Sequence, residues 1–306
     1  LKFIEENKNN PFLLFISHHA PHTPYQAPDS LIEKYIAKGN GKLNKKVATI
    51  YSMIESMDSG IEKVISQLDS LGLKENTIIV FTSDNGAQNT GEDYRFQAGL
   101  SGTKGIVLEG GIRVPAIISW PNHIPKNKTV TSPLHGCDWL PTLLKLSGSS
   151  SKIIGTADGK DISNVLLRKK DKYLKERTLY FQKNRYHPVA YSDAAIIEGE
   201  WKLYWPGISE TMKKESRDNP SVLKGTTEPH WEMACDTTIP LWNDYIPMSP
   251  LLFNLVDDPS ERYDLSAKNP VIVNELVKKW DKWFSDVMED YQKSWKEIKN
   301  VERMKW

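Results

Sequence analysis

The sequence predicts an α/β fold in which a mostly parallel sheet is flanked by helices and followed by a smaller C-terminal unit of antiparallel sheet plus helix. Two continuous apolar runs, residues 11–17 and 77–82, are typical of strands buried on both faces, as in parallel sheets. Between them, residues 45–71 place apolar side chains at helical spacing, which predicts a long helix with one buried stripe that ends at Gly72. The order strand, helix, strand predicts a right-handed crossover between parallel strands.

Two weaker elements follow the second strand. Residues 112–120 are a further strand candidate, although Pro115 is unfavourable inside a sheet. Residues 138–146 are expected to form a short helix, because Pro141 falls in its first turn, where a missing N–H costs nothing.

The pattern changes after about residue 147, where glycine and serine residues indicate a loop. The later apolar segments are shorter and alternate, which is typical of an antiparallel sheet. The expected strands are residues 178–182, 190–197, 201–205 and 251–255, followed by a helix over residues 271–288. We therefore expect two units, residues 1–165 and 166–306. Residues 210–250 lack periodicity and are either an insertion that lines a site or a disordered stretch.

The charge balance excludes partners that are recognised by a strong overall field. The chain has 40 Lys and Arg residues against 39 Asp and Glu residues, a formal net charge of +1. We therefore expect no nucleic-acid partner and no membrane partner, and any anion site must be local. The two cysteines, Cys137 and Cys235, lie in no CxxC or Cys/His cluster, which argues against zinc. They are either small buried residues or one disulfide.

A candidate metal site follows the second strand directly, at Ser83-Asp84-Asn85-Gly86. Ligands of open α/β sheets bind at the carboxyl ends of the strands. The carboxylate of Asp84 and the amide oxygen of Asn85 are hard ligands that suit Ca²⁺ or Mg²⁺, and Gly86 permits a sharp turn beside the ion. The alternative is an ordinary polar turn, which has the same composition.

Two further segments carry residues suited to the chemistry of anionic esters. His22 lies between two prolines just beyond the first strand, where an imidazole could protonate a departing oxygen, or simply bond a loop carbonyl. Lys104 lies in a glycine-spaced loop over residues 99–105 and could bind sulfate or phosphate oxygens. The loop does not match the Walker pattern, and an exposed lysine is the alternative interpretation.

These motifs occur in the order found in type I, formylglycine-dependent sulfatases. The segments Ala20-Pro21-His22-Thr23-Pro24, Ser83 to Gly86, and the loop running on into Glu109-Gly110-Gly111-Ile112-Arg113-Val114-Pro115 carry the resemblance. It extends from about residue 11 to residue 265, includes residues 138–144 and 252–261, and is least specific between residues 166 and 250. The sequence thus resembles the C-terminal portion of an arylsulfatase-like member of the alkaline-phosphatase-like superfamily.

The resemblance implies a role for each candidate residue. Asp84 and Asn85 would be two of the protein ligands of Ca²⁺, with Mg²⁺ as the alternative, while His22 and Lys104 would be catalytic, contacting the bridging oxygen and the sulfate. In this family the nucleophile is a formylglycine made from a C/S-x-P-x-R motif, and neither Cys137 nor Cys235 lies in such a context. We therefore expect an upstream part of the same enzyme to supply the nucleophile and the remaining metal ligands, and we expect this chain alone to be inactive.

The expected activity is sulfuric ester hydrolysis, with a sulfated carbohydrate as the substrate. Arg95 and His187 are candidate substrate-binding residues. Two alternatives stay open: a phosphate or phosphonate ester hydrolase of the same superfamily, and a noncatalytic binding module. The family resemblance also implies a periplasmic or secreted bacterial protein. The sugar, the sulfated position and the oligomeric state do not follow from the sequence.

Overall fold

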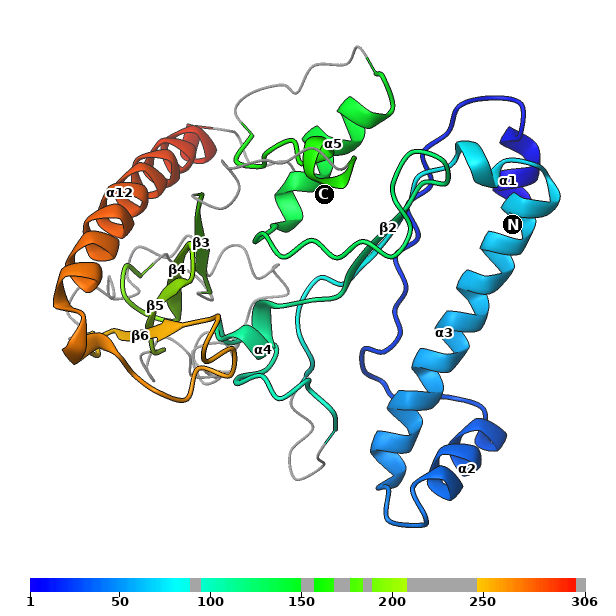
Figure 1. Cartoon of the computed structure of the whole chain (residues 1–306), viewed down its shortest axis with the longest axis horizontal. Coiled ribbons are helices and arrows are strands. Elements are labelled where there is room, and N and C mark those ends of the chain that lie inside the picture. Colours follow the sequence, from blue (N-terminus) through cyan, green and yellow to red (C-terminus); the bar gives the residue numbers. More distant parts are fainter. Residues whose placement is uncertain (89–94, 150–156, 168–176, 184–188, 208–246, 301–306) are drawn as a thin grey trace.

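The computed structural model describes residues 1–88, 95–149, 157–167, 177–183, 189–207 and 247–300, with side chains up to residue 293. The first helices lie at one side of the molecule, a short ladder lies in the middle, and a four-stranded sheet with a long helix lies at the other side (Figure 1). Helices and strands are combined as the α/β class predicts. None of the helices in these ranges has the length and apolar composition that a membrane span requires.

Three helices form the first part of the chain: α1 (Lys2–Asn7), α2 (Asp29–Lys38) and α3 (Lys45–Ser70). The long helix α3 is the one predicted from the spacing of apolar residues, so that prediction is confirmed, and α3 packs along α2. At its end Gly72 adopts a φ of +66°, and the N–H of Leu73 donates to the Leu68 carbonyl over 2.8 Å. This is a Schellman motif, in which a glycine satisfies the last carbonyls of the helix.

The predicted strands at residues 77–82 and 112–120 form as β1 (Ile79–Thr82) and β2 (Ala116–Ser119). They pair antiparallel, with Thr82 opposite Ala116, and β2 begins directly after Pro115. The 3-10 helix η1 (Lys74–Asn76) precedes β1, and the single turn α4 (Glu109–Ile112) precedes β2.

The expected parallel crossover is wrong for residues 11–17 within the described structure. These residues form no strand, and all of them except the half-buried Phe12 are exposed, with Leu13 at 84% and Phe15 at 87% of full exposure. An apolar run is buried as a strand only when other strands flank it, and none of the described strands pairs with this segment.

The short helix predicted at residues 138–146 is α5 (Trp139–Leu146), which follows the 3-10 turn η2 (Gly136–Asp138). The single turn α6 (Ser163–Leu166) packs nearby in a small apolar cluster that includes Trp139. Cys137 is an exposed free thiol, so its expected burial is wrong: the η2 turn leaves its side chain on the surface. Cys235 lies outside the described residues.

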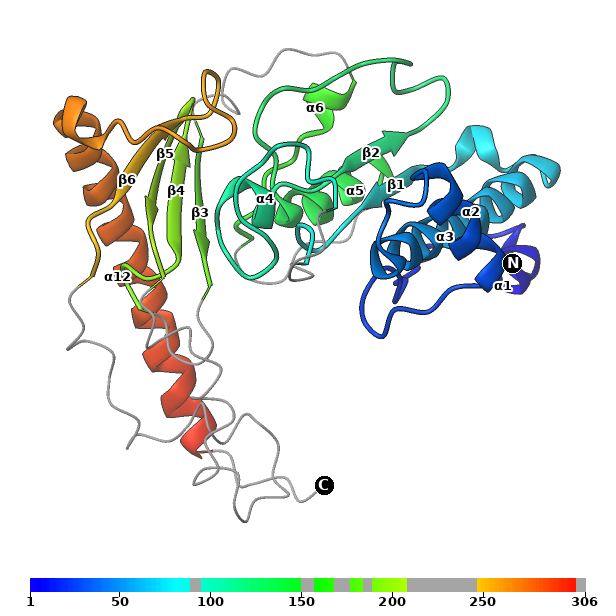
Figure 2. The same ribbon diagram turned by 90° about the horizontal axis from the view of Figure 1, so that it is seen from below.

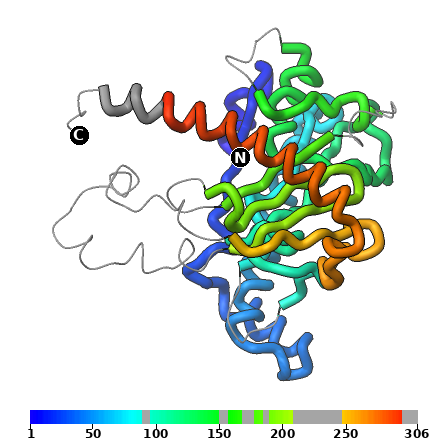
Figure 3. The backbone as a smooth tube through the Cα atoms, turned by 90° about the vertical axis from the view of Figure 1, so that its left-hand side faces the viewer, coloured from blue at the N-terminus to red at the C-terminus, as the bar shows by residue number. Residues whose placement is uncertain are grey.

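The predicted antiparallel sheet is confirmed, with the strand order β3-β4-β5-β6. Its strands are β3 (Thr178–Gln182), β4 (Ala194–Glu198), β5 (Trp201–Trp205) and β6 (Leu251–Asn254). After the 3-10 turn η4 (Ser266–Lys268), helix α12 (Pro270–Asn300) lies across one face of the sheet (Figures 2 and 3). Most of the 210–250 segment lies outside the described residues.

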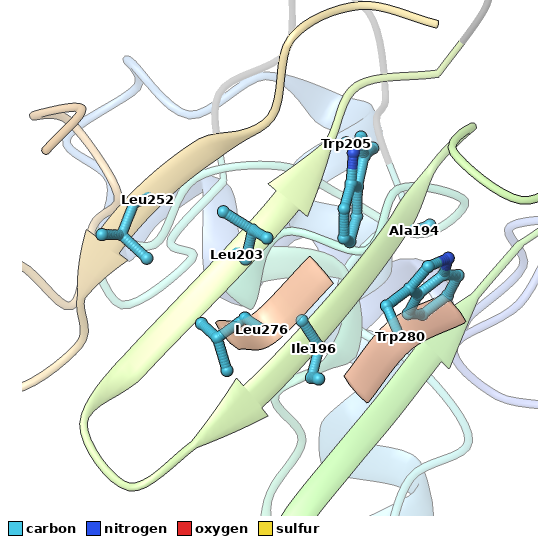
Figure 4. Packing of buried hydrophobic residues seen from close by; sticks show 7 residues of the cluster. All are labelled: Ala194, Ile196, Leu203, Trp205, Leu252, Leu276 and Trp280. Carbon is cyan, nitrogen blue, oxygen red and sulfur yellow. The ribbon is translucent and has the colours of Figure 1, made fainter. Parts of the chain in front are cut away.

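Both faces of this sheet are covered. On the α12 face, seven buried residues form the largest cluster (Figure 4): Ala194, Ile196, Leu203, Trp205, Leu252, Leu276 and Trp280. On the other face, Ala195, Tyr204 and Phe253 pack against Val107, with Leu108 and Ile112 beside them. The sheet is therefore the support on which the chain around α4 rests. The proposed boundary between residues 165 and 166 stays a prediction.

Candidate active site

The candidate metal ligands lie on the turn that leaves β1. Asp84, two residues beyond the end of the strand, is exposed, and the next residue, Asn85, is half-buried. The Ser83 hydroxyl donates to the Asn85 carbonyl over 3.2 Å and lies 3.4 Å from Asp84 Oδ1. These bonds fix the turn locally, and they present a carboxylate next to an amide at the end of the strand.

This turn is bonded directly to the segment that carries Lys104, which we call the Lys104 loop (residues 99–112). The N–H of Gly86 donates to the Gly111 carbonyl, and the N–H of Lys104 donates to the Ala87 carbonyl, each over 2.8 Å. A Cβ at residue 86 would lie 1.9 Å from the Gly110 carbonyl oxygen, so only glycine allows this approach. The structure thus brings the Asp84–Asn85 turn and the backbone of Lys104 together.

The Lys104 loop is also closed on itself. The N–H of Gly110 donates to the Ser101 carbonyl over 2.6 Å. At Gly111 a Cβ would lie 1.8 Å from the Ile106 carbonyl oxygen. The glycines of this loop therefore serve close packing of the backbone.

The antiparallel sheet and its connections hold the same loop from outside. The Ser260 hydroxyl donates to the Gly99 carbonyl over 2.7 Å, and Lys183 Nζ donates to the Gly105 carbonyl over 2.8 Å. Asp193 accepts the N–H of Val107 over 3.0 Å. Asp193 is 1% exposed, and this burial raises the pKa of its carboxyl group to about 6.

A buried ion cluster connects the end of the loop to the sheet. Lys202 Nζ lies 3.0 Å from Glu109 Oε1 and 2.7 Å from Glu261 Oε1. Glu261 Oε2 also accepts the N–H of Glu109 over 2.6 Å. None of these charges was predicted to act at the site, because Lys202 occupies a polar position in an alternating strand, which reads as a solvent-facing residue. The signals available in the sequence were the family resemblance of Glu109-Gly110-Gly111 and that of residues 252–261, which end at Glu261.

A second buried ion pair supports the neighbouring elements. Arg177, just before β3, contacts both carboxylate oxygens of Asp138, over 2.7 and 3.1 Å. Asp138 also accepts the N–H of His135 over 2.7 Å and the N–H of Lys160 over 2.9 Å. These bonds tie the start of α5 to the sheet. The sequence showed Asp138 only as a residue of the predicted helix.

His22 is exposed on a separate segment. Its Nδ1 lies 2.9 Å from the Thr23 carbonyl oxygen, and its ring packs edge-on against His19 at 5.5 Å between centroids. A bond from Nδ1–H to that carbonyl leaves Nε2 as the atom able to hold a transferable proton. Among the described residues, no hydrogen bond or ion pair joins this segment to the Asp84–Asn85 turn. The convergence of His22 on the site stays a prediction.

The two candidates for substrate binding have different outcomes. Arg95 is half-buried, and the N–H of the next residue, Phe96, donates to the Tyr51 hydroxyl over 3.2 Å. This bond anchors the Arg95 segment on α3. His187 lies outside the described residues, so its role stays a prediction.

The side chains of residues 84 and 85 both offer oxygen atoms, which are the ligands that a hard divalent cation prefers. Two such residues are fewer than the ligands that Ca²⁺ needs. Within the ranges that the structure describes, no group of three or more His, Cys, Asp and Glu side chains could hold a metal ion. The residues therefore fit part of a calcium or magnesium site.

The comparison with known proteins identifies the family. The family model described as Sulfatase matches residues 1–149. The chain belongs to the sulfatase family. Mouse steryl-sulfatase is 28% identical to this sulfatase chain over 275 residues, which are 87% of the chain and 40% of the relative. Mouse arylsulfatase J is 31% identical over 285 residues, which are 88% of the chain and 44% of the relative.

Solved structures agree in fold. The crystal structure of Ps i-CgsB is 28% identical, has a TM-score of 0.68, and is matched over 92% of this chain and 52% of its own. This likeness confirms the predicted α/β fold with its smaller antiparallel unit. The sulfatase chain spans less than half the length of the two mouse relatives.

Proposed function

We propose that the complete protein hydrolyses sulfate esters, and that this chain supplies one side of its active site. The observation that carries the proposal is the bonding of the Lys104 backbone to the turn of Asp84 and Asn85. This bonding supports the proposal because it keeps Lys104 on a segment that adjoins the oxygen-bearing side chains of Asp84 and Asn85, and the binding of a sulfate next to a metal requires such an arrangement.

Each residue has a separate task in the proposed reaction. The ammonium of Lys104 binds sulfuryl oxygens and offsets the negative charge that grows on them. His22 gives a proton to the leaving alcohol, for which Nε2 is the available atom. Asp84 and Asn85 hold a divalent cation, which when bound supplies Lewis-acid polarisation of the sulfate. We place the formylglycine nucleophile and the remaining ligands on an upstream segment of the same enzyme.

We further propose a sulfated carbohydrate as the substrate. Ps i-CgsB, which this chain resembles in sequence and fold, has been crystallised with k-i-k-neocarrahexaose. Arg95 and His187 are proposed to contact the saccharide, and a periplasmic or secreted bacterial protein is the proposed setting.

The test of the metal ligands is Asp84→Ala in the complete protein. We expect metal content and the kcat/KM for 4-nitrophenyl sulfate to fall together, because metal binding and catalysis would depend on the same carboxylate. The kcat/KM should fall by about 100-fold or more. Asp69→Ala removes a carboxylate from the surface of α3, where its side chain is 64% exposed, and it should change neither quantity. An Asp84→Ala protein with unchanged metal content refutes the assignment.

The class of ester is tested with the wild-type protein. Parallel assays with 4-nitrophenyl sulfate and 4-nitrophenyl phosphate should show faster sulfate hydrolysis. Faster phosphate hydrolysis would move the protein to the phosphate alternative, and no hydrolysis of either ester would favour a binding module.

A further inference from the structure

We propose that Lys202 is a positioning residue that holds the Lys104 loop against the Asp84–Asn85 turn. The inference deepens the proposed function and rests on it for its catalytic consequence. Lys202 itself lies on β5, on the face of the sheet that α12 does not cover, and it takes no part in the chemistry.

The ammonium of Lys202 joins two segments far apart in the sequence. Its side chain is 0% exposed and lies between Glu109, which begins the last turn of the Lys104 loop, and Glu261, which follows β6. The distances of 3.0 and 2.7 Å place both carboxylates in direct contact with it. One cation therefore bonds the loop to two parts of the C-terminal sheet.

Removal of this cation cannot be compensated by solvent. Glu109 and Glu261 have side chains 8% and 0% exposed, so two carboxylates would remain close together in a low dielectric. Arg113 is the other cation near Glu109, at 3.8 Å, but its side chain is 59% exposed and its contribution is small. Glu261 also adopts a φ of +52°, which is unfavourable for a residue with a side chain and is offset by these contacts.

The path from Lys202 to the site is two residues long. Glu109 is followed by Gly110 and Gly111, whose backbones bond Ser101 and Gly86 respectively. A shift of Glu109 therefore moves both of these contacts. One closes the Lys104 loop, and the other bonds the loop to the Asp84–Asn85 turn. At Gly86 and Gly111 an added Cβ would lie 1.9 and 1.8 Å from a carbonyl oxygen, so the backbones are already in close contact and have little room to shift.

The first experiment measures hydrogen exchange in the complete protein. The variant is Lys202→Met combined with Glu261→Gln, which leaves the net charge of the buried cluster unchanged and keeps an oxygen for the N–H of Glu109. We expect amides in residues 84–88 and 101–112 to exchange at least about 10-fold faster than in wild type, while α3 stays protected. Lys279→Met is the matched control, because Lys279 lies on α12 and makes its ion pair with Glu198 at the end of β4.

Wild-type exchange rates in residues 84–88 and 101–112 of the double variant would overturn the proposal. If the double variant loses protection throughout, Glu261→Gln alone decides the matter: faster exchange confined to the loop supports the proposal, and an unchanged loop refutes it.

The second experiment asks whether Lys202 acts through Lys104. The double-mutant cycle uses kcat/KM for 4-nitrophenyl sulfate. The Lys202→Met/Glu261→Gln change alone should lower kcat/KM by about 10- to 100-fold. When Lys104→Ala is already present, the same change should not lower kcat/KM further. Independent, multiplying losses would refute the positioning role. A wild-type protein without sulfatase activity would refute the proposed function instead, and hydrogen exchange would still test Lys202.

Discussion

Four of the buried charged residues in the part of the chain that the structure describes gather around one loop. Lys202, Glu109, Glu261 and Asp193 are all less than 10% exposed, and each bonds the Lys104 loop or a residue that does. Buried charges cost free energy unless they are paired, so such a cluster persists where it fixes a geometry. At the scale of single residues, the cluster makes the loop depend on the sheet.

Asp193 gives this loop a dependence on pH. The pKa of Asp193 is raised from 3.8 to about 6, so its carboxyl group ionises at a lower pH in the unfolded chain than in the folded protein. The contribution of Asp193 to stability is therefore complete below about pH 4 and is lost as the pH rises through about 6. The nearby cations Lys183 and Lys202 lower this pKa but do not offset the burial.

Asp193→Asn tests this dependence, because the amide keeps an acceptor for the N–H of Val107 and has no proton to lose. Between about pH 4 and pH 7 we expect the free energy of unfolding of wild type to fall relative to the variant by about 3 kcal/mol. Urea denaturation across this range measures the difference. Asp290→Asn, at an exposed position on α12, should keep the wild-type slope; parallel curves for wild type and Asp193→Asn would contradict the assignment.

At the scale of elements, α12 and the antiparallel sheet are the most extensive packed unit. Trp280 is 0% exposed and contacts Trp205 on β5, with 5.2 Å between ring centroids, and Tyr180 on β3, at 6.3 Å. Figure 4 shows its ring among the residues of the sheet. The helix therefore keeps the strands in register behind the face that supports the Lys104 loop.

Trp280→Ala should destabilise the protein by about 3–5 kcal/mol, because the cavity lies where the helix and sheet cannot close over it. Thermal or denaturant unfolding gives the value. Val271→Ala, on the same helix at a position 68% exposed, should change stability by less than about 0.5 kcal/mol. A similar small effect for both variants would show that α12 is not part of the core.

At the scale of the whole molecule, residues 13–16 form a continuous run of exposed apolar side chains. Leu13 and Phe15 are more than 80% exposed, and the segment is extended, with no backbone hydrogen bond to β1 or β2. Such a stretch is an open template for pairing with another strand.

We expect a neighbouring strand to cover this segment in the complete protein, in line with the proposed upstream part. Hydrogen exchange should be slow at residues 12–17 of the complete protein and fast in the 306-residue chain alone. The amides of α3 should be protected in both and serve as the internal reference. Fast exchange at residues 12–17 in the complete protein would contradict the expectation.

Local patterns determined the elements of this protein. The spacing of apolar residues predicted α3, the alternation of residues 178–205 predicted the antiparallel sheet, and Gly72 marked a helix end that the structure shows to be a Schellman motif. Each of these depends on neighbours in the sequence, which the sequence displays directly. The motif at residues 83–86 was likewise placed at the end of a strand, where the structure has it.

Long-range contacts were decided only by the tertiary structure. The sequence alone showed Lys202 as the polar residue of an alternating strand, because alternation reports two faces but not what covers them. The fold places a second layer on that face, so the same lysine becomes a buried link to Glu109 and Glu261. Residues 11–17 show the opposite difference, because they were predicted to be buried and are exposed. The segment has the composition of a buried strand, but burial requires flanking strands, and those are set by the whole chain rather than by the segment.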